Sequence, residues 1–305
     1  MNDTKEIGGY FGLECGLAPH FHQTGIYLNL GRSAIRYVIR ALGIRRMHVP
    51  RYTCHTVGAA LRAEKCEPVF YELDASFLPQ PDFPRDDFVL YNNYFGVSGE
   101  HVRAMAERYP NLIVDNAQAF FSKPKCRAAI YSPRKFFGLP DGGILVGKDI
   151  PGIELPQATS WHDMTHLLKR IDINAQAGYG DFINSDKHMA DAPLQRMSKL
   201  TQALMGNIDT ELAAKRRIAN FAYLHEHLPT SFPLALSSDD VPMVYPYITD
   251  DPNLRERLIR DKIYVAKYWP GVINCESLAE RIVPLPIDQR YDEEDMRRIV
   301  EAVES

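Results

Sequence analysis

The sequence of 305 residues lacks several features that would place it in a specialised class of protein. No run approaches the roughly 20 apolar residues that a transmembrane helix needs. The first residues, MNDTKEIGGYFGLECG, contain no apolar segment of the kind that a signal peptide requires. There is also no internal repeat and no low-complexity stretch. We therefore expect a cytoplasmic protein that does not associate with membranes.

Cysteine is scarce, and neither sign of charge dominates. None of the five cysteines forms a CxxC pair, so the sequence indicates neither a disulfide framework nor a zinc site. His20 and His22 have no companion ligands nearby in the sequence, and we predict no metal site. The 39 acidic and 35 basic residues give a net charge of −4, which excludes a general attraction to nucleic acid. A local pocket for phosphate needs only a few groups and is compatible with this balance.

The order of apolar residues along the first half of the chain alternates between helical and strand patterns. With 45% hydrophobic residues the chain can form a core, which excludes a largely disordered protein. Helical spacing predicts helices at residues 33–42, 56–63 and 101–109, the first with Ser33 as its N-cap and Gly43 as its stop. Short apolar runs predict strands at residues 47–49, 68–71, 88–91, 112–114, 128–131 and 143–146. This alternation is typical of an α/β fold whose sheet is covered on both faces.

The second half of the chain has a different pattern. Residues 161–207 contain few strand signals, and residues 208–228 form one long predicted helix with Asp209 near its start. Further strands are predicted at residues 244–249 and 263–265, and amphipathic helices at residues 253–261 and 293–303. We therefore predict a large α/β domain at residues 1–175 and a smaller α+β domain at residues 176–305.

The segment most informative about chemistry is residues 112–147, LIVDNAQAFFSKPKCRAAIYSPRKFFGLPDGGILVG. Asp115 ends one buried apolar strand, and Lys135 follows the next one. In α/β sheets this end of the strands is where ligands bind. An amine and a carboxylate at neighbouring strand ends suit pyridoxal 5′-phosphate (PLP). That cofactor needs an amine for a Schiff base and an anion beside its pyridine nitrogen. A solvated lysine and an aspartate that caps a turn are the simpler interpretation of either residue alone.

This segment resembles the DegT/DnrJ/EryC1/StrS family of PLP-dependent sugar aminotransferases. VDNAQAF resembles the family's acidic motif, and YSPRKFFGLPDGG resembles its lysine-bearing turn. The resemblance implies that Asp115 pairs with the pyridine nitrogen, that Gln118 contacts the cofactor and that Lys135 is the Schiff-base lysine. It extends over residues 25–303 and implies fold type I, an aspartate-aminotransferase-like large domain with a mixed or parallel sheet and a small α+β domain.

Other segments resemble the family's cofactor and substrate contacts. LNLGRSAIRYVIRALGI resembles the helix whose first amides bind the cofactor phosphate. A helix N-terminus suits an anion, and Arg32 and Ser33 lie at this one. The family's usual serine, five residues before the lysine, is absent here. Ser132 is the nearest hydroxyl and the candidate phosphate contact.

Several positions depart from the family pattern. Cys54, with His55 beside it, occupies the position where the family stacks an aromatic ring on the cofactor. His55 either stacks there or is an ordinary pocket histidine with satisfied hydrogen bonds. Asn93 replaces the family's histidine, and Asn184 lies in the region of the segment that normally reaches the partner subunit. We assign Asn93 and Asn184 to substrate binding.

The resemblance implies an enzyme that transfers an amino group from glutamate or glutamine to a keto sugar that is nucleotide-linked, in polysaccharide or secondary-metabolite synthesis. It also implies a homodimer. Family members that dehydrate sugars have histidine in place of the lysine, so Lys135 favours transamination. Two alternatives remain open: a non-catalytic or regulatory protein of the same fold, and a PLP enzyme with a non-sugar substrate.

Overall fold

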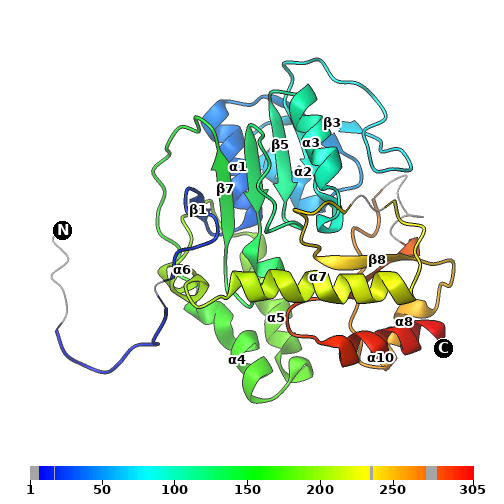
Figure 1. Cartoon of the computed structure of the whole chain (residues 1–305). Helices are drawn as coiled ribbons and strands as arrows, with labels where there is room; N and C mark the ends of the chain where they lie inside the picture. Colours follow the sequence, from blue (N-terminus) through cyan, green and yellow to red (C-terminus); the bar gives the residue numbers. More distant parts are fainter. Residues whose placement is uncertain (1–6, 17, 234–235, 273–279) are drawn as a thin grey trace.

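The sheet of the computed structural model has seven strands in the order β1-β7-β6-β5-β4-β2-β3 (Figure 1). The structure describes residues 7–16, 18–233, 236–272 and 280–305. In chain order the seven strands are β1 (Ile26–Leu28), β2 (Arg46–Pro50), β3 (Glu67–Tyr71), β4 (Val89–Asn92), β5 (Leu112–Asn116), β6 (Ala128–Tyr131) and β7 (Gly143–Gly147).

Strand direction brings the functional segments to one edge of this sheet. β2 is parallel to β3 and β4, β4 is parallel to β5, and β5 is parallel to β6. β7 runs antiparallel to both β6 and β1. The carboxyl ends of β2, β4, β5 and β6 therefore meet at the same edge, and in register Asn92 pairs with Asp115 and Asp115 with Ile130.

Helices cover both faces of the sheet because its strands are apolar on both sides. Leu90 and Ile113 pack in one cluster with α1 (Gly31–Leu42) and α2 (His55–Ala63). Their neighbours in the same strands point the other way and pack in a second cluster with α3 (Gly99–Arg108). Alternation of this kind follows from the two-residue period of a strand, and burial on both faces explains the continuous apolar runs.

The second half of the chain is mostly helical. The described helices after β7 are η3 (Trp161–Met164), α4 (Thr165–Asp172), α5 (Ala175–Ala190), α6 (Lys199–Met205), α7 (Thr210–His227), α8 (Leu254–Arg260) and α10 (Glu293–Glu304). A small antiparallel pair, β8 (Val244–Ile248) and β9 (Ile282–Pro286), packs with α7 and α10 in the same apolar cluster as the α3 face of the sheet. The division of the chain at residue 175 remains a prediction.

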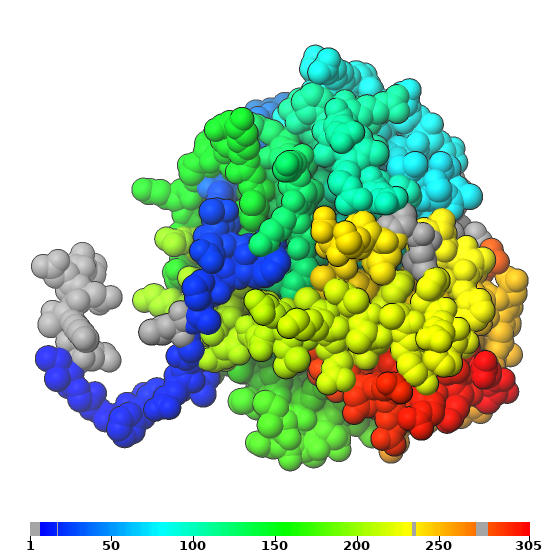
Figure 2. Space-filling model, viewed as in Figure 1, coloured from blue at the N-terminus to red at the C-terminus, as the bar shows by residue number. Residues whose placement is uncertain are grey.

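The first described residues are exposed, and the described helices can be compared with the length and apolar character that a membrane span requires. Figure 2 shows the first described residues, in blue, extending away from the body of the protein, and Ile7, Tyr10 and Phe11 are almost fully exposed. Among the described residues, no helix combines the length and the apolar character needed to cross a membrane.

The predicted α/β class is confirmed, and most predicted elements lie within one or two residues of those observed. Two local predictions are wrong. Ser33 is not an N-cap, because α1 begins at Gly31 after Leu30. Residues 263–265 are not a strand. They follow the end of α8, where the Ile263 amide donates to the Leu258 carbonyl at 2.8 Å and the Ile263 side chain is buried in the core.

His22 makes the stability of this fold depend on pH. Its ring is buried, and its Nε2 lies 2.6 Å from the Phe120 carbonyl oxygen. Burial, and to a lesser extent the charge of Lys123, lowers the pKa of His22 from 6.5 to about 4, although the Phe120 carbonyl opposes the shift. The folded protein therefore binds fewer protons than the unfolded chain between these pH values.

We predict that His22 contributes its full share to the free energy of unfolding above pH 6.5. As the pH falls from 6.5 to 4, protonation of His22 in the unfolded chain should lower the free energy of unfolding by about 3 kcal/mol. Urea unfolding of wild type and His22→Phe across this range measures the effect. The variant should lose part of the pH dependence. Parallel curves for the two proteins would show that His22 is not responsible.

Candidate functional site

Asp115 is the last residue but one of β5, at the carboxyl edge of the sheet. Its Oδ1 accepts a hydrogen bond from the Ala117 amide at 2.8 Å. Burial raises the pKa of the Asp115 carboxyl, whereas the positive charge of Lys135 and the Ala117 amide act to lower it. The fold therefore brings Asp115 and Lys135 within electrostatic reach of each other, as their positions after neighbouring parallel strands predict.

Lys135 ends the single turn η2 (Pro133–Lys135), which directly follows β6, and its side chain is exposed. The next residue anchors the turn. The Phe136 carbonyl accepts hydrogen bonds from Gln289 Nε2 at 2.8 Å and from Arg217 Nη2 at 3.4 Å. Arg217 is almost completely buried, and its guanidinium also lies 4.6 Å from the centre of the Phe136 ring. Arg217 and Gln289 thus fix the backbone beside Lys135.

Asp141 anchors the turn at its other end. Its buried carboxylate accepts hydrogen bonds from the Ser198 amide at 2.9 Å and the Ser198 hydroxyl at 2.8 Å. The Thr201 hydroxyl donates to the same carboxylate. The turn between β6 and β7 is therefore tied to the start of α6. No sequence motif predicts these contacts, because the residues that hold Phe136 and Asp141 come 57 to 153 residues later in the chain.

No side chain caps the backbone amides at the start of α1, although the Ser33 amide donates to the Leu30 carbonyl at 3.0 Å. Leu30 precedes the helix without a side-chain cap, and the first turn contains no acidic residue. Such a helix end carries unpaired N–H groups and a partial positive charge. A Cβ on Gly31 would lie 3.3 Å from the Ser132 Cβ, so Ser132 lies directly against this helix start. Ser33 is buried there, and its Oγ has no partner among the described residues. Arg32 Nη1 donates to the Ala190 carbonyl at 2.8 Å.

Gln118 belongs to a buried amide network beside Asp115. Its Oε1 accepts from the Phe95 amide at 2.9 Å, which holds Phe95 in a left-handed conformation with φ of 56°. Asn93 Nδ2 donates to Asn116 Oδ1 at 3.1 Å, and Asn93 Oδ1 accepts from the Ser98 amide at 3.2 Å. Within the described part of the chain, the Nε2 of Gln118 and the Nδ2 of Asn116 have no partner. Asn93 is buried within this network, whereas Gln118 retains a free donor.

The remaining predicted residues lie on α5 and around the start of α2. Cys54 precedes α2, after the end of β2, and the Thr56 hydroxyl donates to its Sγ at 3.1 Å. His55, the first residue of α2, is exposed. Asn184 lies on α5 and lines a pocket with His162, Asp163 and His188, a pocket that no other predicted site residue lines.

The donors and charges of this edge of the sheet fit PLP. Asp115 offers an anion and Lys135 an amine, and the start of α1 offers amides for a phosphate. The unpartnered Ser33 Oγ and Gln118 Nε2 are buried polar atoms that a bound molecule would satisfy. Binding by each of these residues remains a prediction.

Comparison with solved structures identifies the class of fold, that of PLP-dependent aminotransferases of fold type I. Structures of the DegT/DnrJ/EryC1/StrS kind match over more than nine-tenths of the chain. The DegT DnrJ EryC1 StrS aminotransferase from Brucella abortus matches with a TM-score of 0.59 and 17% identity, covering 92% of this chain and 85% of that one. The sugar aminotransferase CalS13 from Micromonospora echinospora matches with a TM-score of 0.59 and 14% identity, covering 92% and 87%.

The match also includes a structure that holds the cofactor. The PLP form of Spr1654 from Streptococcus pneumoniae has a TM-score of 0.62 and 13% identity, covering 93% of this chain and 87% of that one. Neither a family model nor a curated protein matches the sequence. At these identities the similarity shows that the chain shares the fold of these aminotransferases, which confirms the fold that the resemblance implies.

We predict that Gly143→Ala destabilises the site as well as the fold. A Cβ at Gly143 would lie 2.0 Å from the Leu30 carbonyl oxygen, immediately before α1, so the backbone must move. We expect a loss of about 2 kcal/mol or more in the free energy of unfolding, the range for an overpacked core. Gly152→Ala is the control, because no atom lies within 4 Å of its Cβ position. Equal urea midpoints for the two variants would contradict this prediction.

Proposed function

We propose that the protein is a PLP-dependent aminotransferase that moves an amino group from glutamate or glutamine to a keto sugar, one that is nucleotide-linked. The observation that carries this proposal is the placement of Asp115 on β5 and Lys135 directly after the neighbouring parallel strand β6, at the same edge of the sheet. Asp115 supplies a fixed anion and Lys135 a mobile amine, and together they meet the two chemical needs of the cofactor.

Each group has a role that its position supports. When bound, PLP supplies an electron sink for the bond that breaks at the amino carbon. Asp115 holds a proton at the pyridine nitrogen, because a nearby anion favours the protonated ring. The Lys135 amine would hold the cofactor covalently and, when free, would carry a proton to and from the amino carbon. The amides at the start of α1, with Ser33 and Ser132, would bind the phosphate, and Gln118 Nε2 would donate to an acceptor atom of the cofactor.

The proposed keto-sugar acceptor and the proposed homodimer have separate arguments. The similar structures include a sugar aminotransferase, CalS13, which favours a keto sugar as the acceptor. Lys135 stands where sugar dehydratases of the resembling family have histidine, which favours transamination. We propose that the protein acts in the cytoplasm as a homodimer whose partner subunit completes each site. Cys54, His55, Asn93 and Asn184 are proposed to lie around the cofactor and the substrate.

We predict that PLP added to the purified protein forms a bond that borohydride fixes to Lys135. Peptide mass spectrometry should locate one pyridoxyl group per chain on that lysine, together with a change in visible absorption. Lys135→Ala should abolish both, and Lys148→Ala, at another exposed lysine, should change neither. A pyridoxyl group on a different lysine would disprove the assignment. A protein that remains colourless would favour the non-catalytic alternative.

We predict that Asp115→Asn retains PLP but slows transamination by about 100-fold or more, within the range for a positioned proton-handling group. An uncharged amide does not favour the protonated ring, so the electron sink weakens. The release of 2-oxoglutarate from glutamate in a single turnover measures this step without knowledge of the sugar. A rate equal to that of wild type would refute the role of Asp115. A panel of keto-sugar nucleotides and other carbonyl compounds then separates sugar from non-sugar acceptors.

A further inference from the structure

Helices α4 and α5 form a hairpin that packs beside η3, and the last residue of α5, Ala190, accepts a hydrogen bond from Arg32 at the start of α1. The Lys169 Nζ lies 2.7 Å from Asp181 Oδ2 across the two helices. Asn174 caps α5 by accepting from the Ala177 amide at 2.9 Å. A Cβ on Gly178 would lie 2.8 Å from the His166 carbonyl oxygen, so glycine allows the helices to approach closely. These contacts give the hairpin a defined geometry.

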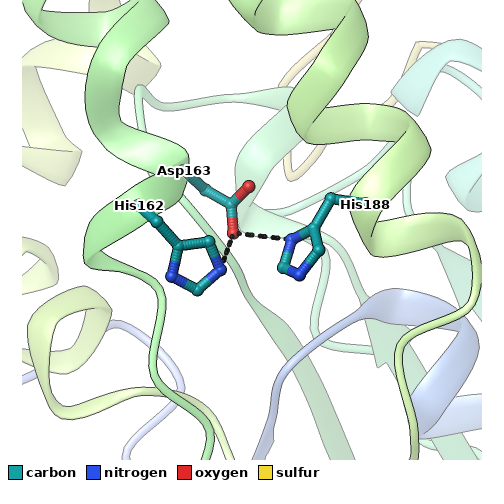
Figure 3. A group of neighbouring side chains, drawn as sticks. All are labelled: His162, Asp163 and His188. Carbon is teal, nitrogen blue, oxygen red and sulfur yellow. Dashed lines mark ion pairs between the residues drawn. The ribbon is translucent and has the colours of Figure 1, made fainter.

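This hairpin and η3 hold three side chains that metal ions bind. His162 and Asp163 are adjacent on η3, and His188 lies in the last turn of α5. Figure 3 shows the Asp163 carboxylate between the two imidazole rings, with both contacts made by one oxygen. That Oδ2 lies 3.2 Å from His162 Nε2 and 3.4 Å from His188 Nδ1. Asp163 is buried, whereas both histidines reach the surface.

Two of the three distances between these atoms match those between the ligands of one small metal ion. Two ligand atoms about 2.1 Å from zinc, at a tetrahedral angle, lie about 3.4 Å apart. The two carboxylate–imidazole distances of 3.2 and 3.4 Å are close to this value. One ligand atom from each of the three residues lies within 4.8 Å of the others. Binding one ion would require the two exposed rings to rotate so that their nitrogens come closer together.

A second feature of the same place indicates a ligand. His162, Asp163, His188 and Ser185 line a pocket of about 200 Å³. Ser185 is 5% exposed, and within the described ranges its Oγ has no hydrogen-bond partner. A buried hydroxyl without a partner is costly, and a water molecule on a metal ion would satisfy it. Ser185 and His188 lie three residues apart on α5 and so share a face of the helix.

We propose that His162, Asp163 and His188 form a binding site for one divalent transition-metal ion of the Zn²⁺ type, with a water molecule near Ser185 as the fourth ligand. Two imidazoles and one carboxylate suit such ions, whereas Mg²⁺ and Ca²⁺ prefer oxygen ligands alone. The ion would join η3 to the end of α5. The sequence pattern did not reveal it because the third ligand lies on a separate helix that only the hairpin brings close.

Zinc binding to the full chain, prepared without PLP and treated with a chelator, tests this proposal. Calorimetric titration with Zn²⁺ should give one site per chain in wild type. His188→Gln and Asp163→Asn should weaken that site by about 100-fold or more, since even partners outside the ligand shell contribute 10–100-fold. His188 is more than half exposed, so His188→Gln should fold normally even if Asp163→Asn does not.

Two controls separate this site from others. His227→Gln, at an exposed histidine on α7, should bind Zn²⁺ as wild type does. Lys135→Ala should also keep the site, so this test stands independently of the proposed reaction. Co²⁺ should give visible bands of a four-coordinate ion in wild type and not in His188→Gln. If wild type does not bind Zn²⁺, or if His188→Gln and wild type bind it equally, the proposal is wrong.

Discussion

Burial disfavours the charged form of the Asp115 carboxylate, and the arrangement of the site depends on the groups that stabilise this charge. An isolated buried carboxylate tends to take up a proton. The Ala117 amide and the Lys135 amine act against that tendency. The protonated ring nitrogen of a bound PLP would act in the same direction, because a nearby cation favours the charged carboxylate. The fold therefore holds a carboxylate whose charged form a nearby cation stabilises.

The lysine that acts on this charge has a fixed backbone and an exposed side chain. The parallel strands β5 and β6 deliver Asp115 and the lysine turn to the same edge of the sheet. Arg217 and Gln289 then hold the Phe136 carbonyl, and Ser198 and Thr201 hold Asp141. The Lys135 side chain itself stays exposed. A fixed backbone with a mobile amine is the combination that both covalent binding and proton transfer require.

Local pattern predicted much of the large sheet, and contacts between distant residues explain what it missed. Runs such as those in β5 and β6 identify buried strands because both of their faces are apolar. β1 has only three residues at the edge of the sheet and gave no signal. The prediction of Ser33 as the N-cap relied on the preference of serine for that position. In the structure α1 begins two residues earlier, at Gly31. Arg217, Gln289 and the His162–Asp163–His188 cluster depend on packing that no short motif encodes.

The anchors of the lysine turn have a consequence for the synthesis of the chain. The sheet strands are complete once Gly147 has been made, but Asp141 finds its partners only when Ser198 and Thr201 follow. The Phe136 carbonyl can accept its hydrogen bonds only after Arg217 and then Gln289, close to the C-terminus, have been synthesised. Contacts of such sequence separation form late, because closing the long loops costs entropy before the contacts repay it. We therefore expect the backbone beside Lys135 to become fixed late in folding, once the C-terminal part of the chain is available.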